Sequence, residues 1–177
     1  MVLSKNMQKL VAGSSTIRKL FEEGIELAKV VGAENVYDFS LGNPAAPVPE
    51  QVKKSIYDIL ENRNANFVHC YMPNAGYPEV REKVAANLNK KYDSSFTKED
   101  IIMTVGAAGG INCVLRCLLE QEDEVLCFAP FFGEYNSYVM NFGGNLKVVP
   151  ADYETFQLNV EEADKYITER TKAVIIN

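Results

Sequence analysis

A turn of small residues at positions 106–110, Gly-Ala-Ala-Gly-Gly, carries the clearest chemical signal in the sequence. It follows a short apolar run, 101–105, and precedes a stretch with helical periodicity that reaches about Leu119. The first backbone N–H groups of a helix lack intrahelical acceptors and carry partial positive charge, so they can bind a phosphate. No Gly-Lys-Ser/Thr follows, and the glycine spacing is not G-x-G-x-x-G. The turn is either a phosphate site made of backbone amides or a tight packing turn.

Two aromatic residues, Phe131 and Phe132, follow the next predicted strand, 124–129. Ligands of open parallel sheets lie beyond the carboxyl ends of the strands. An aromatic ring at that position can stack on a flat ligand, on the same edge of the sheet as the turn at 106–110. The alternative is that both rings belong to the core, and we expect this of at least one of them.

Two loops hold weaker candidates. Tyr71 lies in the loop 69–77, where a tyrosine hydroxyl can donate to a phosphate oxygen, although an ordinary surface turn fits as well. Gly42 lies in the segment 40–44, where the lack of a side chain lets a backbone N–H face a ligand, unless this is a plain turn. His69, the single histidine, has no acidic or nucleophilic partner at a recognisable spacing and is interpreted as structural.

The elements that must position these residues follow from the hydrophobic periodicity. Strands that alternate with helices predict an α/β fold, with a parallel sheet covered on both faces. The last strand reads as fully buried, so we expect a truncated product or one piece of a longer chain, rather than a complete domain ending on an edge strand. Helices are predicted at 14–31, 50–61, 79–92, 106–119, 135–142 and 160–168, and strands at 101–105, 124–129, 146–149 and 172–176.

Composition and charge restrict the kind of partner. The net charge is -6 and no basic stripe is present, which argues against a nucleic-acid surface. Cys113 and Cys117 would share a helix face, but a metal site needs further ligands, so we predict no metal and buried, reduced thiols for all four cysteines. There is no apolar run of membrane-spanning length and no signal peptide, and we expect a cytoplasmic protein without membrane contacts.

Four stretches occur in an order that resembles the class I/II aminotransferases of the aspartate aminotransferase fold: SLGNPAAPVPE, YMPNAGYPEVREKVA, TVGAAGGINCVLRCLL and VLCFAPFFGEY. The resemblance runs from about residue 14 to the end. It implies a three-layer α/β fold with a mainly parallel sheet, and pyridoxal 5'-phosphate as cofactor. It also implies that residues 1–44 form an N-terminal arm and part of a small domain, and that 45–177 form the first, incomplete half of the large cofactor-binding domain.

The resemblance assigns cofactor contacts to four residues. Gly106, Ala107 and Ala108 match the turn whose backbone N–H groups hold the cofactor phosphate, and Phe132 matches the aromatic residue that stacks on the pyridine ring. Many relatives have a hydroxyl side chain in this turn, whereas this sequence has two alanines. Backbone contacts are therefore expected, with fewer side-chain contacts.

The resemblance also implies contacts outside this turn. Tyr71 matches the tyrosine that reaches the phosphate of the neighbouring subunit, which predicts a homodimer, and Gly42 matches the glycine near the substrate carboxylate. Asn177 precedes the loop whose asparagine touches the cofactor, so it is given no site role. No catalytic residue is assigned, because the Schiff-base lysine is expected beyond Asn177 and no lysine present lies in a matching motif.

The predicted function is therefore amino-group transfer between an amino acid and a 2-oxo acid by the complete protein, with this chain alone expected to be inactive. A carbon–sulfur lyase or a decarboxylase of the same fold remains open, because the deciding residues lie elsewhere. A non-catalytic, truncated cofactor-binding fragment and an unrelated nucleotide-binding α/β domain are the alternatives from other classes. The absorbance of a lysine-bound cofactor would favour the enzyme over the non-catalytic fragment. A preference for nucleotides over pyridoxal phosphate would favour the nucleotide-binding domain.

Overall fold

The computed structural model describes residues 3–12, 16–40, 42 and 46–177. The chain forms two compact units, Met1–Ile102 and Met103–Asn177. The domain boundary predicted between residues 44 and 45 lies outside the described residues and stays a prediction.

The first unit is helical. The predicted helices at 14–31, 50–61 and 79–92 are confirmed as α2, α3 and α5, while the short α1 and α4 were not predicted. Pro78 begins α5, and its missing N–H costs no hydrogen bond because the first N–H of a helix has no acceptor within the helix. The helix ends at Asp93 in a left-handed conformation with φ 50°. The elements are α1 (Lys5–Ala12), α2 (Thr16–Val31), the 3-10 helix η1 (Ala33–Asn35), α3 (Glu50–Asn62), α4 (Ala65–Val68), α5 (Pro78–Tyr92) and η2 (Lys98–Asp100).

A buried arginine ties α5 to the segment that follows it. Arg81 is buried, with only 8% of its surface exposed. Its Nη1 donates to the carbonyl of Lys98 at 2.7 Å and, more weakly, to that of Ile101 at 3.4 Å. Glu99 lies 3.8 Å away and is exposed. The two carbonyl contacts therefore anchor η2 and the start of the following segment against α5.

Arg81→Met is expected to lower the free energy of unfolding by about 2–3 kcal/mol, because a charged hydrogen bond is lost and two carbonyls lose their donor. Urea unfolding of the protein measures this change. Glu99→Gln removes only the exposed ion pair, and is expected to change stability by less than about 1 kcal/mol. Equal effects of the two substitutions would contradict the anchoring role of the carbonyl contacts.

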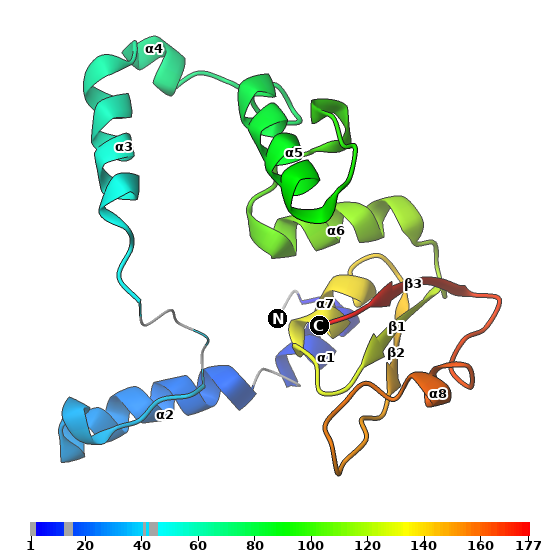
Figure 1. Cartoon of the computed structure of the whole chain (residues 1–177). Coiled ribbons are helices and arrows are strands. Elements are labelled where there is room, and N and C mark those ends of the chain that lie inside the picture. Colours follow the sequence, from blue (N-terminus) through cyan, green and yellow to red (C-terminus); the bar gives the residue numbers. More distant parts are fainter. Residues whose placement is uncertain (1–2, 13–15, 41, 43–45) are drawn as a thin grey trace. The chain divides into compact units, whose positions relative to one another are not determined.

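The second unit contains a parallel sheet in the order β2-β1-β3 (Figure 1). Leu126 of the central strand is in register with Lys147 on one side and Val174 on the other. The predicted α/β fold class is confirmed. The elements are α6 (Gly106–Leu118), β1 (Glu124–Phe128), α7 (Glu134–Met140), β2 (Asn145–Val149), α8 (Val160–Ala163) and β3 (Thr171–Ile175).

Helices cover both faces of this sheet. All five residues of β1 are buried, and successive side chains point to opposite faces. One face packs Val125 against Leu115 and Leu119, at the end of α6, and Val139 of α7. The other face packs Leu126 and Phe128 against Val149 of β2 and Ala163 of α8. The central strand is thus covered by an apolar layer on each face, which is the arrangement expected for parallel strands.

A buried carboxylate connects the strands at the amino edge of the sheet. Glu124, the first residue of β1, accepts a hydrogen bond from Thr168 Oγ1 at 2.6 Å and pairs with Lys147 Nζ at 3.3 Å. The hydrogen bond from Thr168 lowers the pKa of Glu124, and the nearby Lys147 acts in the same direction. The carboxylate is therefore held in its charged form between β2 and the turn before β3.

Several sequence predictions for residues 101–177 are wrong. Residues 101–105 form no strand, and Val105 is 95% exposed, because in the described part of the chain no strand pairs with this run. The last strand is not fully buried: among the described residues β3 pairs only with β1, and Val174 is 48% exposed. The helix expected at 160–168 stops at Ala163.

The prediction of buried cysteines holds for one of the four. Cys127, inside β1, is buried, whereas Cys70, Cys113 and Cys117 are exposed. Cys113 and Cys117 lie on the side of α6 that faces away from the core residue Leu115. In the described residues, no group of three or more His, Cys, Asp or Glu side chains is placed to hold a metal ion.

Candidate functional site

The start of α6 has the geometry of an anion site. Gly106 has φ 69°, a conformation that glycine adopts readily, and a Cβ placed there would have open space around it. Its N–H donates to the carbonyl of Thr104 at 3.0 Å. Val105 supplies no side-chain cap, and Ala107 and Ala108 are exposed. The N–H groups of these two alanines belong to the first helical turn and have no intrahelical acceptor, so they are available to an anion.

Thr104 closes this turn from the side. Its Oγ1 donates to the carbonyl of Gly106 at 3.1 Å. A Cβ on Gly110 would lie 3.2 Å from Thr104 Oγ1. A Cβ on Gly109 would make only ordinary van der Waals contacts, at 3.7 Å from the Cβ of Val105 and 3.8 Å from the Cβ of Thr104. Glycine is therefore favoured at Gly106 by the backbone conformation and at Gly110 by close packing. Neither constraint applies at Gly109.

Gly106→Ala is expected to lower the free energy of unfolding by about 1–2 kcal/mol, because alanine is strained in the left-handed region. Gly109→Ala is the matched control, because its added methyl group makes only ordinary contacts within a helix. It should stabilise the protein by about 0.5–1 kcal/mol. Chemical denaturation of both variants and of the parent measures the difference. If both substitutions stabilised the protein to the same degree, the positive φ of Gly106 would not be a feature of the fold.

Phe132 presents an open aromatic ring in the loop between β1 and α7. It is 46% exposed and belongs to neither core cluster. Its ring lies nearly perpendicular to that of Tyr135, with ring centroids 5.7 Å apart and planes at 84°. The hydroxyl of Tyr135 donates to Asn177 Oδ1 at 2.8 Å. The ring of Phe132 thus contacts Tyr135, while nearly half of the residue's surface stays open to a flat ligand.

The topology brings these groups to one edge of the sheet. Phe132 follows β1 and Asn177 follows β3, so both lie at the carboxyl edge of the parallel strands. Helix α6 packs on the sheet and ends just before β1 begins, at the amino edge. Its 13 residues span about 20 Å, which carries its first turn back to the carboxyl edge. Ala107, Ala108 and Phe132 therefore share this edge.

The remaining predicted site residues lie in the first unit. Tyr71 is fully exposed in the loop before α5. Gly42 is exposed, and a Cβ added to it would meet no atom of the described residues within 4 Å. Their expected contacts with a cofactor and a substrate stay predictions. The sequence interpretation gave no role to Thr104, Tyr135 or Asn177. A hydroxyl two residues before the turn and a tyrosine three residues after Phe132 were the available signals.

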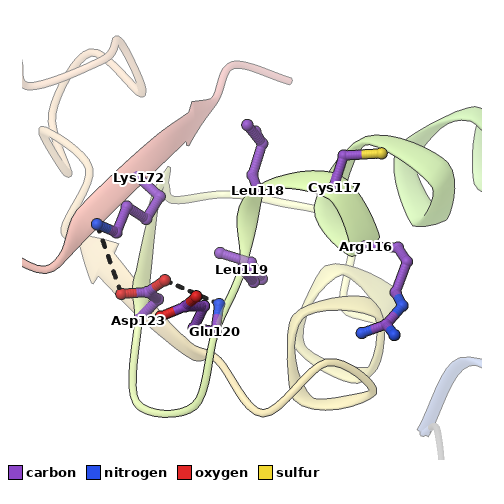
Figure 2. A pocket seen from close by; sticks show the side chains of 7 residues that line it. All are labelled: Arg116, Cys117, Leu118, Leu119, Glu120, Asp123 and Lys172. Atoms are coloured by element: carbon purple, nitrogen blue, oxygen red, sulfur yellow. Dashed lines mark hydrogen bonds and ion pairs between the residues drawn. The ribbon is translucent and has the colours of Figure 1, made fainter.

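A surface hollow lies at the opposite edge of the sheet. Figure 2 shows Lys172 of β3 facing Asp123, with 3.8 Å between the charged atoms. Asp123 also accepts the backbone N–H of Glu120 at 2.8 Å. These groups satisfy one another where α6 connects to β1, and parallel sheets bind ligands at the other edge. We interpret the hollow as structural. Its lining residues are Arg116, Cys117, Leu118, Leu119, Glu120, Asp123 and Lys172.

The parallel sheet, and a small-residue helix start at its carboxyl edge, define an α/β domain of the ligand-binding kind. None of the helices in the described ranges has the length and apolarity needed to cross a bilayer. The sequence matches the family described as aminotransferase class I and II over residues 33–177. The chain belongs to this aminotransferase family.

Individual relatives agree with this assignment. Aspartate aminotransferase of Pyrococcus abyssi is 35% identical over 165 residues, covering 92% of this chain and 40% of that protein. Aromatic-amino-acid aminotransferase 2 of Thermococcus litoralis is 35% identical over 179 residues, covering 100% of this chain and 43% of that protein. The chain thus spans about two fifths of the length of these relatives.

Solved structures give the same result. A crystal structure of an amino transferase from Eubacterium rectale superposes with a TM-score of 0.92 at 38% identity, covering 100% of this chain and 45% of that one. Aspartate aminotransferase from Thermus thermophilus with maleate superposes with a TM-score of 0.83 at 28% identity, covering 100% and 44%. The resemblance noted from four sequence stretches is confirmed.

Proposed function

We propose that the complete protein is a pyridoxal-phosphate-dependent aminotransferase that moves an amino group between an amino acid and a 2-oxo acid. Family membership supports this function, as do the names of the aspartate and aromatic-amino-acid relatives. One observation of this chain carries the proposal. By the order of the elements and the length of α6, the free amides of Ala107 and Ala108 and the exposed ring of Phe132 lie at the same edge of the sheet. That pairing suits a ligand with an anionic group attached to a flat ring.

The residues present fit this cofactor in two ways. The amides of Ala107 and Ala108 would hold its phosphate, while Gly106, whose own N–H already bonds to Thr104, sets the shape of the turn. Phe132 would stack on its ring and exclude water from one face. When bound, pyridoxal phosphate supplies an electron sink for negative charge at the substrate's α carbon. The lysine that binds it covalently is proposed to lie beyond Asn177.

Two further roles belong to the first unit. Tyr71 is proposed to donate its hydroxyl to the cofactor phosphate of the neighbouring subunit in a homodimer, and its full exposure supports this role. Gly42 is proposed to lie near the substrate carboxylate. We also propose that the enzyme is cytoplasmic, which cell fractionation would test.

The function is tested with the full-length protein and added pyridoxal phosphate. The expected results are a bound-cofactor absorbance band and a new amino acid formed from a 2-oxo acid, with aspartate and aromatic amino acids tried first as donors. Release of carbon dioxide, or of a sulfur-containing product, without a new amino acid would instead indicate a decarboxylase or a lyase. Binding of nucleotides in preference to pyridoxal phosphate would refute the proposal altogether.

A further inference from the structure

Tyr135 makes two contacts with the proposed ring-binding residue, Phe132, and a third with Asn177. Its ring meets Phe132 edge to face, and its backbone N–H donates to the carbonyl of Phe132 at 3.1 Å. Its hydroxyl donates to Asn177 Oδ1 at 2.8 Å, across 42 residues of sequence. The same side chain therefore links the loop after β1 to the residue that follows β3.

Tyr135 also contacts a second aromatic side chain. Tyr138, one helical turn later, lies with its ring centroid 6.3 Å from that of Tyr135. Tyr138 in turn packs against the core cluster that contains Val125 and Val139. A continuous series of contacts thus runs from the buried core through Tyr138 and Tyr135 to the ring of Phe132.

We infer that Tyr135 is a positioning residue, which sets the ring plane of Phe132 for cofactor stacking and is itself held in place by Asn177. This inference rests on the proposed function. Phe132 lies on a loop and is 46% exposed, so its ring contact with Tyr135 is well placed to restrict rotation of the Phe132 side chain. The hydroxyl of Tyr135 is not deeply buried, so its hydrogen bond should affect orientation more than overall stability.

The experiment uses the full-length protein reconstituted with pyridoxal phosphate. It measures the Kd of the cofactor, the circular dichroism induced in the bound cofactor, and the melting temperature. Tyr135→Phe keeps the ring and removes the hydroxyl, and Asn177→Ala removes its acceptor. The matched control is Tyr138→Phe, because its hydroxyl forms no hydrogen bond within the described part of the chain. Phe132→Leu reports the full effect of losing the stacking ring.

Tyr135→Phe and Asn177→Ala are each expected to weaken cofactor binding by about threefold to tenfold, the usual effect of one hydrogen bond. Both should reduce the induced circular dichroism and leave the melting temperature nearly unchanged. The double variant should be no worse than either single variant, because both remove the same bond. Tyr138→Phe should behave like the parent protein.

Different results separate the inference from the proposed function. If Phe132→Leu loses affinity and circular dichroism while Tyr135→Phe retains both, the positioning role is wrong and the proposed function stands. If Tyr135→Phe lowers only the melting temperature, its role is structural and the inference is also overturned. If the parent protein binds no pyridoxal phosphate, the proposed function fails, and the inference fails with it.

Discussion

Ala107→Asp should weaken pyridoxal phosphate binding by about 100-fold or more, a loss of about 2.7 kcal/mol, without destabilising the protein. Two unit charges 4 Å apart at a protein surface interact with about 4 kcal/mol at an effective dielectric constant of 20. A carboxylate at position 107 would lie beside the amides that we assign to the cofactor phosphate. Repulsion of that size easily exceeds the predicted loss.

The same substitution is favourable for the helix, which makes the test specific. Ala107 is the second residue of α6, and an aspartate in the first turn interacts well with the helix dipole, by about 0.3–1 kcal/mol. The melting temperature without cofactor should therefore stay the same or rise. Loss of binding could not then be attributed to unfolding.

Ala107→Asn is the matched control, because it has nearly the shape of aspartate without its charge. It should bind pyridoxal phosphate within about threefold of the parent, since the backbone amides are retained. Titration followed by absorbance measures both affinities, and a parallel melting experiment measures stability. Equal affinities for the aspartate and asparagine variants would show that the phosphate does not lie at the start of α6.

Leu126→Ala is expected to lower the free energy of unfolding by about 3–4 kcal/mol, which lies within the range of about 3–5 kcal/mol found for leucine-to-alanine substitutions in packed cores. Leu126 is almost completely buried in the central strand, where it packs with Phe128, Val149 and Ala163. Both neighbouring strands are paired with β1, which limits how far they can move in to fill the cavity. That loss is a large part of the total stability of a typical domain, about 5–15 kcal/mol.

Urea unfolding tests this prediction, with the midpoint expected to fall at an unchanged slope. Leu158→Ala is the control, because it removes the same atoms from an exposed position outside the sheet. It should cost less than about 1 kcal/mol. If the two leucine variants were equally stable, Leu126 would not lie in a close-packed layer.

Local patterns predicted the elements that local interactions decide. The run 124–129 contains a buried strand because continuous apolar residues are what a strand covered on both faces requires. The helix at 79–92 was found from its apolar spacing, and its start at Pro78 agrees with the preference of proline for a first turn. The turn of small residues at 106–110 was predicted to open a helix, and α6 begins at Gly106.

Pairing between distant segments was the main source of error. The run 101–105 has the composition of a strand, but a strand also needs a neighbour, which no local pattern supplies. The exposure of Val174 depends on the order of strands in the sheet, and therefore on contacts far apart in the sequence. The bond between Tyr135 and Asn177 was missed for the same reason, since 42 residues separate its partners.

The donors at the start of α6 are main-chain amides, and this has a consequence for how binding would respond to acidity. Amide groups do not ionise in the physiological range, unlike the lysine or histidine side chains of many anion sites. Any change in phosphate affinity between mildly acidic and neutral solution would then come from the ligand, whose second proton dissociates near about pH 6. The protein's side of this contact would be constant across that interval.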